Sequence, residues 1–195
     1  MAKLEHKIGV FGGSFDPIHM GHLIIAESAR QQFRLEKVIF IPSNIPPHRG
    51  ALVASATRRF EMVKLAIMDN PVFDVSDIEI NRAGISYTYE TLMLLQQQLR
   101  SKIVLIIGWD AFLILPSWYN AEKLAEKFSF IVAPRITENS EMPRFPFPAK
   151  YEILEAPRIE ISSTLIRKKI KANQSIRYLV PDKVFHYIMK ENIYG

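Results

Sequence analysis

Five consecutive apolar residues, Ile103-Val104-Leu105-Ile106-Ile107, place the strongest constraint on the fold of this chain. Most of them are β-branched, and β-branched side chains favour extended backbone. Because no polar side chain alternates with them, both faces of the predicted strand must be buried. A strand buried on both faces belongs in the middle of a parallel sheet that helices cover, so the run predicts an α/β protein.

Strand and helix patterns alternate along the rest of the chain. Residues 8–11 form an apolar run, residues 21–33 carry apolar side chains at helical spacing, and residues 38–41 form a second apolar run. This order predicts a strand–helix–strand unit with a right-handed crossover. Further helices are expected over residues 58–68, 89–99, 163–171 and 181–191, and further strands over residues 73–80 (one or two), 103–107, 128–132 and 151–154.

These patterns predict a Rossmann-like open parallel sheet with helices on both faces. A length of 195 residues is typical of one domain, so we expect a single domain over residues 1–195. Ligands of such sheets bind at the carboxyl ends of the strands, where the chemistry of this chain is therefore expected. The polar, proline-containing stretch 137–150 is interpreted as a loop.

Composition excludes several classes of protein. The chain has no cysteine, which rules out disulfides, thiolate metal sites and cysteine nucleophiles. No apolar run approaches the ~20 residues of a membrane helix, and the N-terminus lacks a signal-peptide pattern, so we expect a cytoplasmic protein with no membrane partner. The 25 Lys and Arg against 20 Asp and Glu give a net charge of +5, which attracts nucleic acid or smaller phosphates alike.

The segment 12–22, GGSFDPIHMGH, follows the first predicted strand and opens the first predicted helix. It matches neither G-x-G-x-x-G nor the P-loop pattern. His19 and His22 lie three residues apart around Gly21, so their imidazoles share a face of the helix and could donate to a phosphoryl group. A structural role is the alternative for either histidine, and a zinc pair is disfavoured because no third ligand is near, so no metal site is predicted.

A second polar cluster, Ser162-Ser163-Thr164, lies between a strand-like stretch and the helix expected over residues 163–171. Ser162 or Ser163 is the expected N-cap. Arg167 lies one turn into that helix, close enough to share an anion with the N–H groups of the helix start. Plain capping beside a solvated arginine is the alternative interpretation.

The two motifs together resemble the nucleotidyltransferase superfamily that carries His/Thr-x-Gly-His near its N-terminus and Ser-x-Thr-x-x-Arg near its C-terminus. Within it, the chain resembles the bacterial nicotinate-nucleotide adenylyltransferases nearly from end to end. This narrower resemblance rests on five segments, IPSNIPPHR, SYT, IIGWD, LPSWY and YLVP, which occupy residues 41–49, 86–88, 106–110, 115–119 and 178–181.

The resemblance implies a single nucleotidyltransferase domain that transfers the adenylyl group of ATP to nicotinate mononucleotide, giving deamido-NAD and pyrophosphate in NAD biosynthesis. The attacking phosphate is already anionic, so catalysis needs positioning and charge stabilisation rather than a protein nucleophile. Mg²⁺ is expected as a cofactor bound through the ATP phosphates. His19, His22 and Arg167 are the implied catalytic residues. The implied ATP-binding residues are these three with Gly12, Gly13, Ser14, Phe15, Gly108, Asp110, Ser162 and Thr164.

The resemblance also implies a site for the acceptor. Trp118 would stack on the pyridine ring, with core packing as the alternative, and the backbone N–H groups of Thr88 and Tyr119 would bind the nicotinate carboxylate. That contact would select the acid over the amide. The implied residues for nicotinate mononucleotide are Asn44, His48, Ser86, Thr88, Trp118, Tyr119 and Arg135. Arg49 is a further candidate for the acceptor phosphate; surface charge is the alternative for both arginines, and a helix N-cap for Asp110.

The chain departs from the family pattern at three places, the least consequential being Glu90 where Asp is frequent. Trp109 is bulky where a small or polar residue is common, and residues 133–135 lack the common Arg-Pro-Gly turn. Rival interpretations are an adenylyltransferase for the amide or for phosphopantetheine, a nucleic-acid-binding module, and an inactive relative. We expect no nucleic-acid partner, because there is no aromatic RNA-binding motif and no long basic run. The family resemblance implies a homo-oligomer.

Overall fold

The computed structural model describes residues 7–47, 50, 52–82, 84–99, 101–134, 143–157 and 159–195. Six strands form one sheet in the order β3-β2-β1-β4-β5-β6. They are β1 (Lys7–Gly13), β2 (Lys37–Pro42), β3 (Phe73–Val75), β4 (Lys102–Gly108), β5 (Ser129–Ala133) and β6 (Tyr151–Ile153). The pairs β1/β4, β4/β5 and β5/β6 are parallel, and Ile106 lies opposite Phe11 and Ile131. The apolar run 103–107 therefore occupies the middle of a parallel sheet, as predicted.

Eight α-helices and one short 3-10 helix are present among the described residues. They are α1 (Met20–Gln32), α2 (Ala56–Ile67), α3 (Ile78–Arg82), α4 (Thr88–Leu99), α5 (Trp109–Leu113), η1 (Leu115–Ser117), α6 (Ala121–Lys127), α7 (Ser163–Lys171) and α8 (Asp182–Lys190). The order of strands and helices confirms the predicted Rossmann-like α/β fold. None of the described helices is long and apolar enough to cross a membrane.

The prediction for residues 73–80 is half wrong, because only β3 is a strand and Ile78 begins α3. The Ser76 hydroxyl accepts a hydrogen bond from the N–H of Ile78 at 3.3 Å, and the Asn81 N–H donates to the Asp77 carbonyl at 2.9 Å. Such local side-chain bonds turn the backbone away from the extended conformation. Residues 78–80, which were expected to belong to a strand, therefore lie in the first turn of α3.

The chain divides into two compact units, and the single domain expected over residues 1–195 stays a prediction. The first unit combines residues 1–12, 25–39 and 87–158, and the second combines residues 13–24, 40–86 and 159–195. Strands β1 and β2 and helix α1 each run from one unit into the other. Each unit is built from three separate stretches of sequence, so long-range contacts hold it together.

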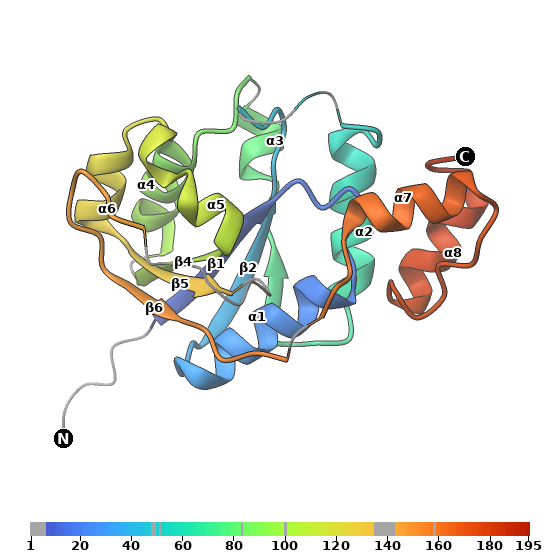
Figure 1. Ribbon diagram of the computed structural model, residues 1–195, viewed down its shortest axis with the longest axis horizontal. Helices are drawn as coiled ribbons and strands as arrows, with labels where there is room; N and C mark the ends of the chain where they lie inside the picture. The colour runs from blue at the N-terminus through green and yellow to red at the C-terminus, as the bar shows by residue number, and fades with distance from the viewer. Residues whose placement is uncertain are drawn as a thin grey trace. The chain divides into compact units, whose positions relative to one another are not determined.

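The first unit buries the apolar side chains of β4 and β5. Figure 1 shows α4 and α6 on one face of these strands and α1 on the other. Gly9 of β1 allows close packing, since a Cβ atom there would lie 2.8 Å from the Leu35 side chain and 3.0 Å from that of Ile106. The core is completed by Leu92, Leu95, Phe112, Leu115, Leu124 and Phe130.

The second unit packs α2 against α8, which lie side by side in Figure 1. The buried faces carry Met62 and Val63 on one helix and Val184 and Ile188 on the other. Fully burying an aliphatic side chain of this size contributes about 1.5–3 kcal/mol, so this pair of faces anchors the C-terminal segment of the chain to α2.

Candidate active site

The two predicted histidines lie at the start of α1. The rings of His19 and His22 stack with centroids 3.7 Å apart and 29° between their planes. The backbone N–H of His19 donates to Nδ1 of His22 at 3.3 Å. Because this bond makes Nδ1 an acceptor, the neutral imidazole of His22 carries its proton on Nε2. His22 can therefore donate a hydrogen bond through Nε2 to a phosphate oxygen.

His19 is buried, with 6% of its surface exposed. Burial lowers the pKa of His19 from the ordinary 6.5 to about 4, because water no longer solvates the imidazolium. Its Nδ1 has no hydrogen-bond partner within the described part of the chain. A Cβ atom on Gly21 would lie 3.1 Å from this nitrogen, so any side chain at position 21 would press on the His19 ring.

The second motif forms the start of α7. Ser162 is the N-cap and accepts a hydrogen bond from the Leu165 N–H at 3.1 Å, while the Ser163 hydroxyl donates to the Pro17 carbonyl at 2.9 Å. The carbonyl of Ile161 lies 3.8 Å from the position of a Cβ atom on Gly21. The structure therefore brings the histidine motif and the Ser-x-Thr-x-x-Arg motif together within the second unit.

Arg167 is held by two hydrogen bonds. Its Nη1 donates to the backbone carbonyl of Asp16 at 2.6 Å, and its Nη2 donates to the Thr164 hydroxyl at 3.3 Å. The side chain is half-buried. The alternative of a freely solvated arginine is wrong, since these bonds hold the guanidinium beside the helix start.

Asp16 is a functional candidate that the sequence analysis missed, although it lies inside the quoted segment 12–22. Only 3% of its surface is exposed. Its carboxylate accepts hydrogen bonds from the N–H groups of Val53 and Ala54 at 2.9 and 3.1 Å, and from the Tyr194 hydroxyl at 2.7 Å. One carboxylate oxygen lies 4.0 Å from Nη1 of Arg167. The sequence signal that could have identified it is an acidic residue inside a motif whose other functional residues are expected to bind phosphate.

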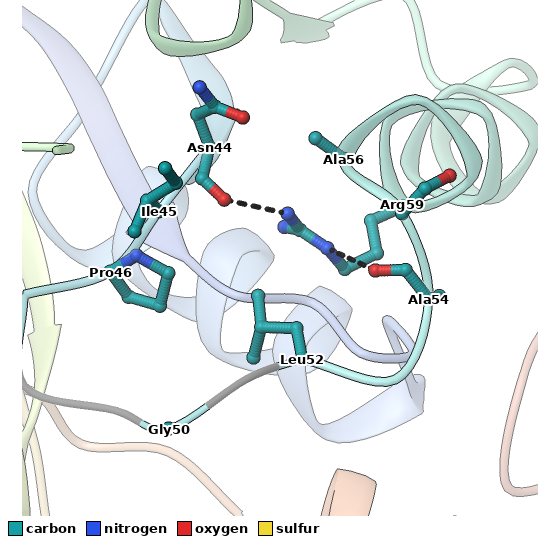
Figure 2. Close-up of a pocket in the computed structure, with 9 residues that line it drawn as sticks. Asn44, Ile45, Pro46, Gly50, Leu52, Ala54, Ala56 and Arg59 are labelled. Carbon is teal, nitrogen blue, oxygen red and sulfur yellow. Dashed lines mark hydrogen bonds between the residues drawn. The ribbon is translucent and has the colours of Figure 1, made fainter. Parts of the chain in front are cut away.

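Arg59 of α2 is a second missed residue, and 1% of its surface is exposed. Its guanidinium donates to the carbonyls of Ser14, Ser43, Asn44 and Ala54 at 2.6–3.2 Å; Figure 2 shows the bonds to Asn44 and Ala54. It borders a cavity of about 260 Å³ with Asn44, Ile45, Pro46, Gly50, Leu52, Ala54, Ser55 and Ala56. Burial lowers its pKa, and the charge of Asp16 opposes that lowering. Arg59 thus ties the turn after β1 to the turn after β2.

The predicted glycine-containing turn ends β1. Gly12 is exposed and has open space on its Cβ side, whereas a Cβ atom on Gly13 would lie 3.0 Å from the Phe15 ring. Phe15 has a left-handed backbone, with φ of 46°, and its buried ring makes an edge contact with His22 at 5.0 Å between centroids. Ser14 is half-buried and contributes its carbonyl to Arg59. The turn thus connects the backbone after β1 to the histidine pair.

Two of the predicted acceptor residues meet in the second unit. The N–H of Asn44 donates to the Ser86 hydroxyl at 2.8 Å, and the Ser86 N–H donates to the Ile45 carbonyl at 2.9 Å. The Asn44 amide also donates to the Gly84 carbonyl at 3.4 Å. These bonds join the turn after β2 to the segment before α4.

The remaining predicted acceptor residues that the structure describes lie in the first unit. Thr88 begins α4, where the first N–H groups have no partner within the helix. The rings of Tyr87 and Tyr119 pack with centroids 4.4 Å apart. Trp118 is half-buried, and its indole N–H has no partner among the residues described. The neighbouring motifs SYT and LPSWY are therefore in contact.

Gly108 and Asp110, which the resemblance implies as ATP-binding residues, lie at the carboxyl end of the central strand β4. Gly108 is the N-cap of α5, so the alternative role of Asp110 as a helix N-cap is wrong. Asp110 lies exposed in the first turn of α5. Trp109 is buried and packs near Phe112, with ring centroids 6.3 Å apart. The unusual tryptophan is therefore part of the core of the first unit.

Three predicted residues, His48, Arg49 and Arg135, lie outside the described residues. Within the described ranges, no group of three or more His, Asp or Glu side chains could hold a metal ion.

Comparison with known proteins places this geometry in a family. The family model described as cytidylyltransferase-like matches residues 10–169. The chain belongs to the cytidylyltransferase-like family. Two curated relatives are each named "Probable nicotinate-nucleotide adenylyltransferase". The one from Synechococcus sp. (strain JA-3-3Ab) is 46% identical, over 97% of this chain and 95% of the relative. The one from Dictyoglomus thermophilum is 45% identical, over 96% of this chain and 99% of the relative. The resemblance that the motifs predicted is confirmed.

Solved structures agree on the fold of this cytidylyltransferase-like chain. The nicotinic acid mononucleotide adenylyltransferase of Plasmodium falciparum complexed with NaAD matches with a TM-score of 0.81 and 21% identity, over 97% of this chain and 98% of that one. The same enzyme complexed with APC matches with a TM-score of 0.78 and 20% identity, over the same shares. At this level of identity, the likeness establishes the shared fold.

Proposed function

We propose that this chain is a nicotinate-nucleotide adenylyltransferase, which transfers the adenylyl group of ATP to nicotinate mononucleotide and releases pyrophosphate. The observation that carries the proposal is the meeting of two motifs in the second unit: His22, with its proton on Nε2, and Arg167, fixed by Asp16. The names of the relatives at 38–46% identity support the same substrates.

In this reaction, a phosphate oxygen of nicotinate mononucleotide attacks the α-phosphorus of ATP. The bond from the α-phosphorus to the bridging oxygen breaks, and its electrons leave with pyrophosphate. Negative charge therefore grows on the leaving group, and donors aimed at that charge lower the barrier. Mg²⁺ bound through the ATP phosphates would supply charge neutralisation for them.

The phosphate-binding roles are divided between the two motifs. His22 donates from Nε2 to a phosphate oxygen near the reacting phosphorus. Arg167, Thr164 and the first N–H groups of α7 bind the leaving phosphates, because a helix start attracts anions. His19 stays neutral at pH 7 since its pKa is about 4, and it supports His22 through ring stacking and its backbone N–H. Gly12, Gly13, Ser14 and Phe15 approach ATP through their backbone, and Gly108 and Asp110 bind the ribose.

On the acceptor side, Trp118 stacks on the pyridine ring, and the backbone N–H groups of Thr88 and Tyr119 bind its carboxylate. An amide lacks the anionic acceptor that these donors require, so the acid is preferred. Asn44, Ser86, His48 and Arg135 complete the proposed set for the mononucleotide. A cytoplasmic location, a homo-oligomer and the absence of nucleic-acid and membrane partners stay predictions.

The test is pyrophosphate release by the purified chain with Mg²⁺, ATP and one acceptor at a time. Nicotinate mononucleotide is expected to support turnover, and the amide to support much less. Equal turnover with both would keep the chemistry but refute the proposed carboxylate selection. Turnover with neither, but with phosphopantetheine, would refute the proposed acceptor. Release without any acceptor would indicate ATP hydrolysis instead.

A further inference from the structure

A buried tyrosine near the C-terminus contacts Asp16, the residue whose backbone carbonyl holds Arg167. Tyr194 follows α8, and only 4% of its surface is exposed. Its hydroxyl donates to one carboxylate oxygen of Asp16 at 2.7 Å, and lies 4.0 Å from the sulfur of Met62. Burial raises the pKa of Tyr194, and the hydrogen bond to Asp16 raises it further. The hydroxyl therefore stays protonated and acts as a permanent donor.

The backbone of Tyr194 also has an unfavourable conformation. Tyr194 has a φ of 77°, in the left-handed region that side chains with a Cβ atom rarely adopt. Such a conformation is unfavourable for a bulky residue and persists only where the surroundings impose it. The hydroxyl that bonds to Asp16 therefore belongs to a residue whose backbone conformation is strained.

Hydrogen-bond donors on one side and the guanidinium of Arg167 on the other compete for the Asp16 carboxylate. Three donors hold the carboxylate: two N–H groups, of Val53 and Ala54, and the Tyr194 hydroxyl. The guanidinium of Arg167 donates to the backbone carbonyl of Asp16 and makes only a long ion pair with carboxylate oxygen Oδ2, at 4.0 Å from Nη1, while the Tyr194 hydroxyl holds the other oxygen, Oδ1. A direct two-bond pair between this arginine and the carboxylate would occupy the N–H groups that an incoming phosphate needs.

We propose that Tyr194 is a positioning residue for ATP, which holds the Asp16 carboxylate away from Arg167 and so keeps the guanidinium available to the leaving phosphates. This inference rests on the proposed function and extends it to a residue that touches no substrate. Loss of the hydroxyl lets the carboxylate turn toward the guanidinium. The ion pair with Arg167 then shortens, and the variant spends binding energy of ATP on breaking it.

Tyr194→Phe removes the hydroxyl and keeps the buried ring. We expect KM for ATP to rise about tenfold, with KM for nicotinate mononucleotide changed less than twofold. Tyr187→Phe is the matched control, because Tyr187 belongs to the same C-terminal segment, is half-buried and has no contact with Asp16 among the bonds of the described residues. It is expected to leave both values unchanged. A lower melting temperature with unchanged KM for ATP would overturn the positioning role.

A double-mutant cycle tests the route through Asp16. Asp16→Asn removes the charge that competes for Arg167, so Tyr194→Phe is expected to change KM for ATP less than twofold in that background. An undiminished tenfold effect there would refute the route. Hydrogen exchange of the Val53 and Ala54 amides in Tyr194→Phe alone gives a second readout that does not need the Asp16→Asn variant to fold. Faster exchange is expected, and unchanged exchange would also refute the route.

Wild-type turnover separates this inference from the proposed function. If the wild-type chain converts nicotinate mononucleotide and Tyr194→Phe behaves like wild type, only the role of Tyr194 fails. If the wild-type chain binds ATP but uses no acceptor, the proposed reaction fails. The melting-temperature rise caused by Mg²⁺ and ATP then tests Tyr194 by itself: a smaller rise in Tyr194→Phe supports the role, and an equal rise overturns it.

Discussion

His19 should make the stability of this chain depend on pH between about 6.5 and 4. In the folded chain its pKa is lowered to about 4 by burial, whereas the unfolded chain regains the ordinary value of 6.5. The unfolded chain therefore binds a proton more readily as the pH falls through this window. Stability is fully present above pH 6.5 and is progressively lost toward pH 4.

The size of the effect follows from the two pKa values. At pH 5 the imidazole is almost fully protonated in the unfolded chain but mostly neutral in the folded one. Linkage then predicts that His19 alone lowers the free energy of unfolding by about 2 kcal/mol between pH 7 and pH 5. With a urea dependence of about 2 kcal/mol per molar, the unfolding midpoint should shift by about 1 M.

The assay is urea unfolding at pH 7 and pH 5 for the wild type, His19→Asn and His186→Asn. An asparagine side chain cannot take up a proton, so the loss of stability of His19→Asn between the two pH values should be smaller than that of the wild type by about 2 kcal/mol. His186 is exposed on α8, and its replacement should leave the wild-type pH dependence intact. Equal pH dependence in the wild type and His19→Asn would refute the claim that burial keeps His19 neutral.

Substitutions at three further residues test the site. His22→Asn keeps an acceptor for the His19 N–H but removes the Nε2 proton, so kcat should fall about 10²–10³-fold. His22→Gln can place an N–H near the same point, so its kcat should fall less. Steady-state pyrophosphate release measures both variants, and equal losses of kcat would contradict the proton assigned to Nε2. Arg59→Met leaves four carbonyls without their donor and should cost about 3 kcal/mol in urea unfolding, and a loss below about 1 kcal/mol would contradict its role in joining the turns. Trp118→Ala should raise KM for nicotinate mononucleotide about tenfold more than KM for ATP, while an equal rise in both would indicate packing instead of stacking.

The regular part of the fold was predictable because its signals are local. The apolar run 103–107 and the spacing in residues 21–33 follow directly from which faces are buried. The helices α5 and α6, and η1 between them, were missed because each covers two turns or fewer, too little for a period to be visible. The strand expected through Ile80 was wrong because side-chain bonds at Ser76 and backbone bonds near Asp77 begin a helix there.

The candidate site also has a part that local sequence signals predict and a part that they do not. His19, His22 and Arg167 could be proposed from the sequence because each lies in a short motif with a chemical reason for its spacing. The support for these residues was missed, since it depends on partners that no spacing rule connects: Arg59 with Ser14 at a separation of 45 residues, and Asp16 with Tyr194 at 178. The burial of His19 was not predicted, because the sequence favoured a ring that donates to phosphate over a structural role.

These long separations have a consequence for the order of events during synthesis. The bond from Ser163 to Pro17 spans 146 residues, that from Arg167 to Asp16 spans 151, and that from Tyr194 to Asp16 spans 178. A ribosome adds about 5–20 residues per second, so roughly 10–40 s pass between the making of Asp16 and the making of its last partner. A nascent chain therefore carries both histidines long before it can hold a nucleotide. A chain released before Arg167 and Tyr194 are made would carry both histidines without these two bonds to Asp16.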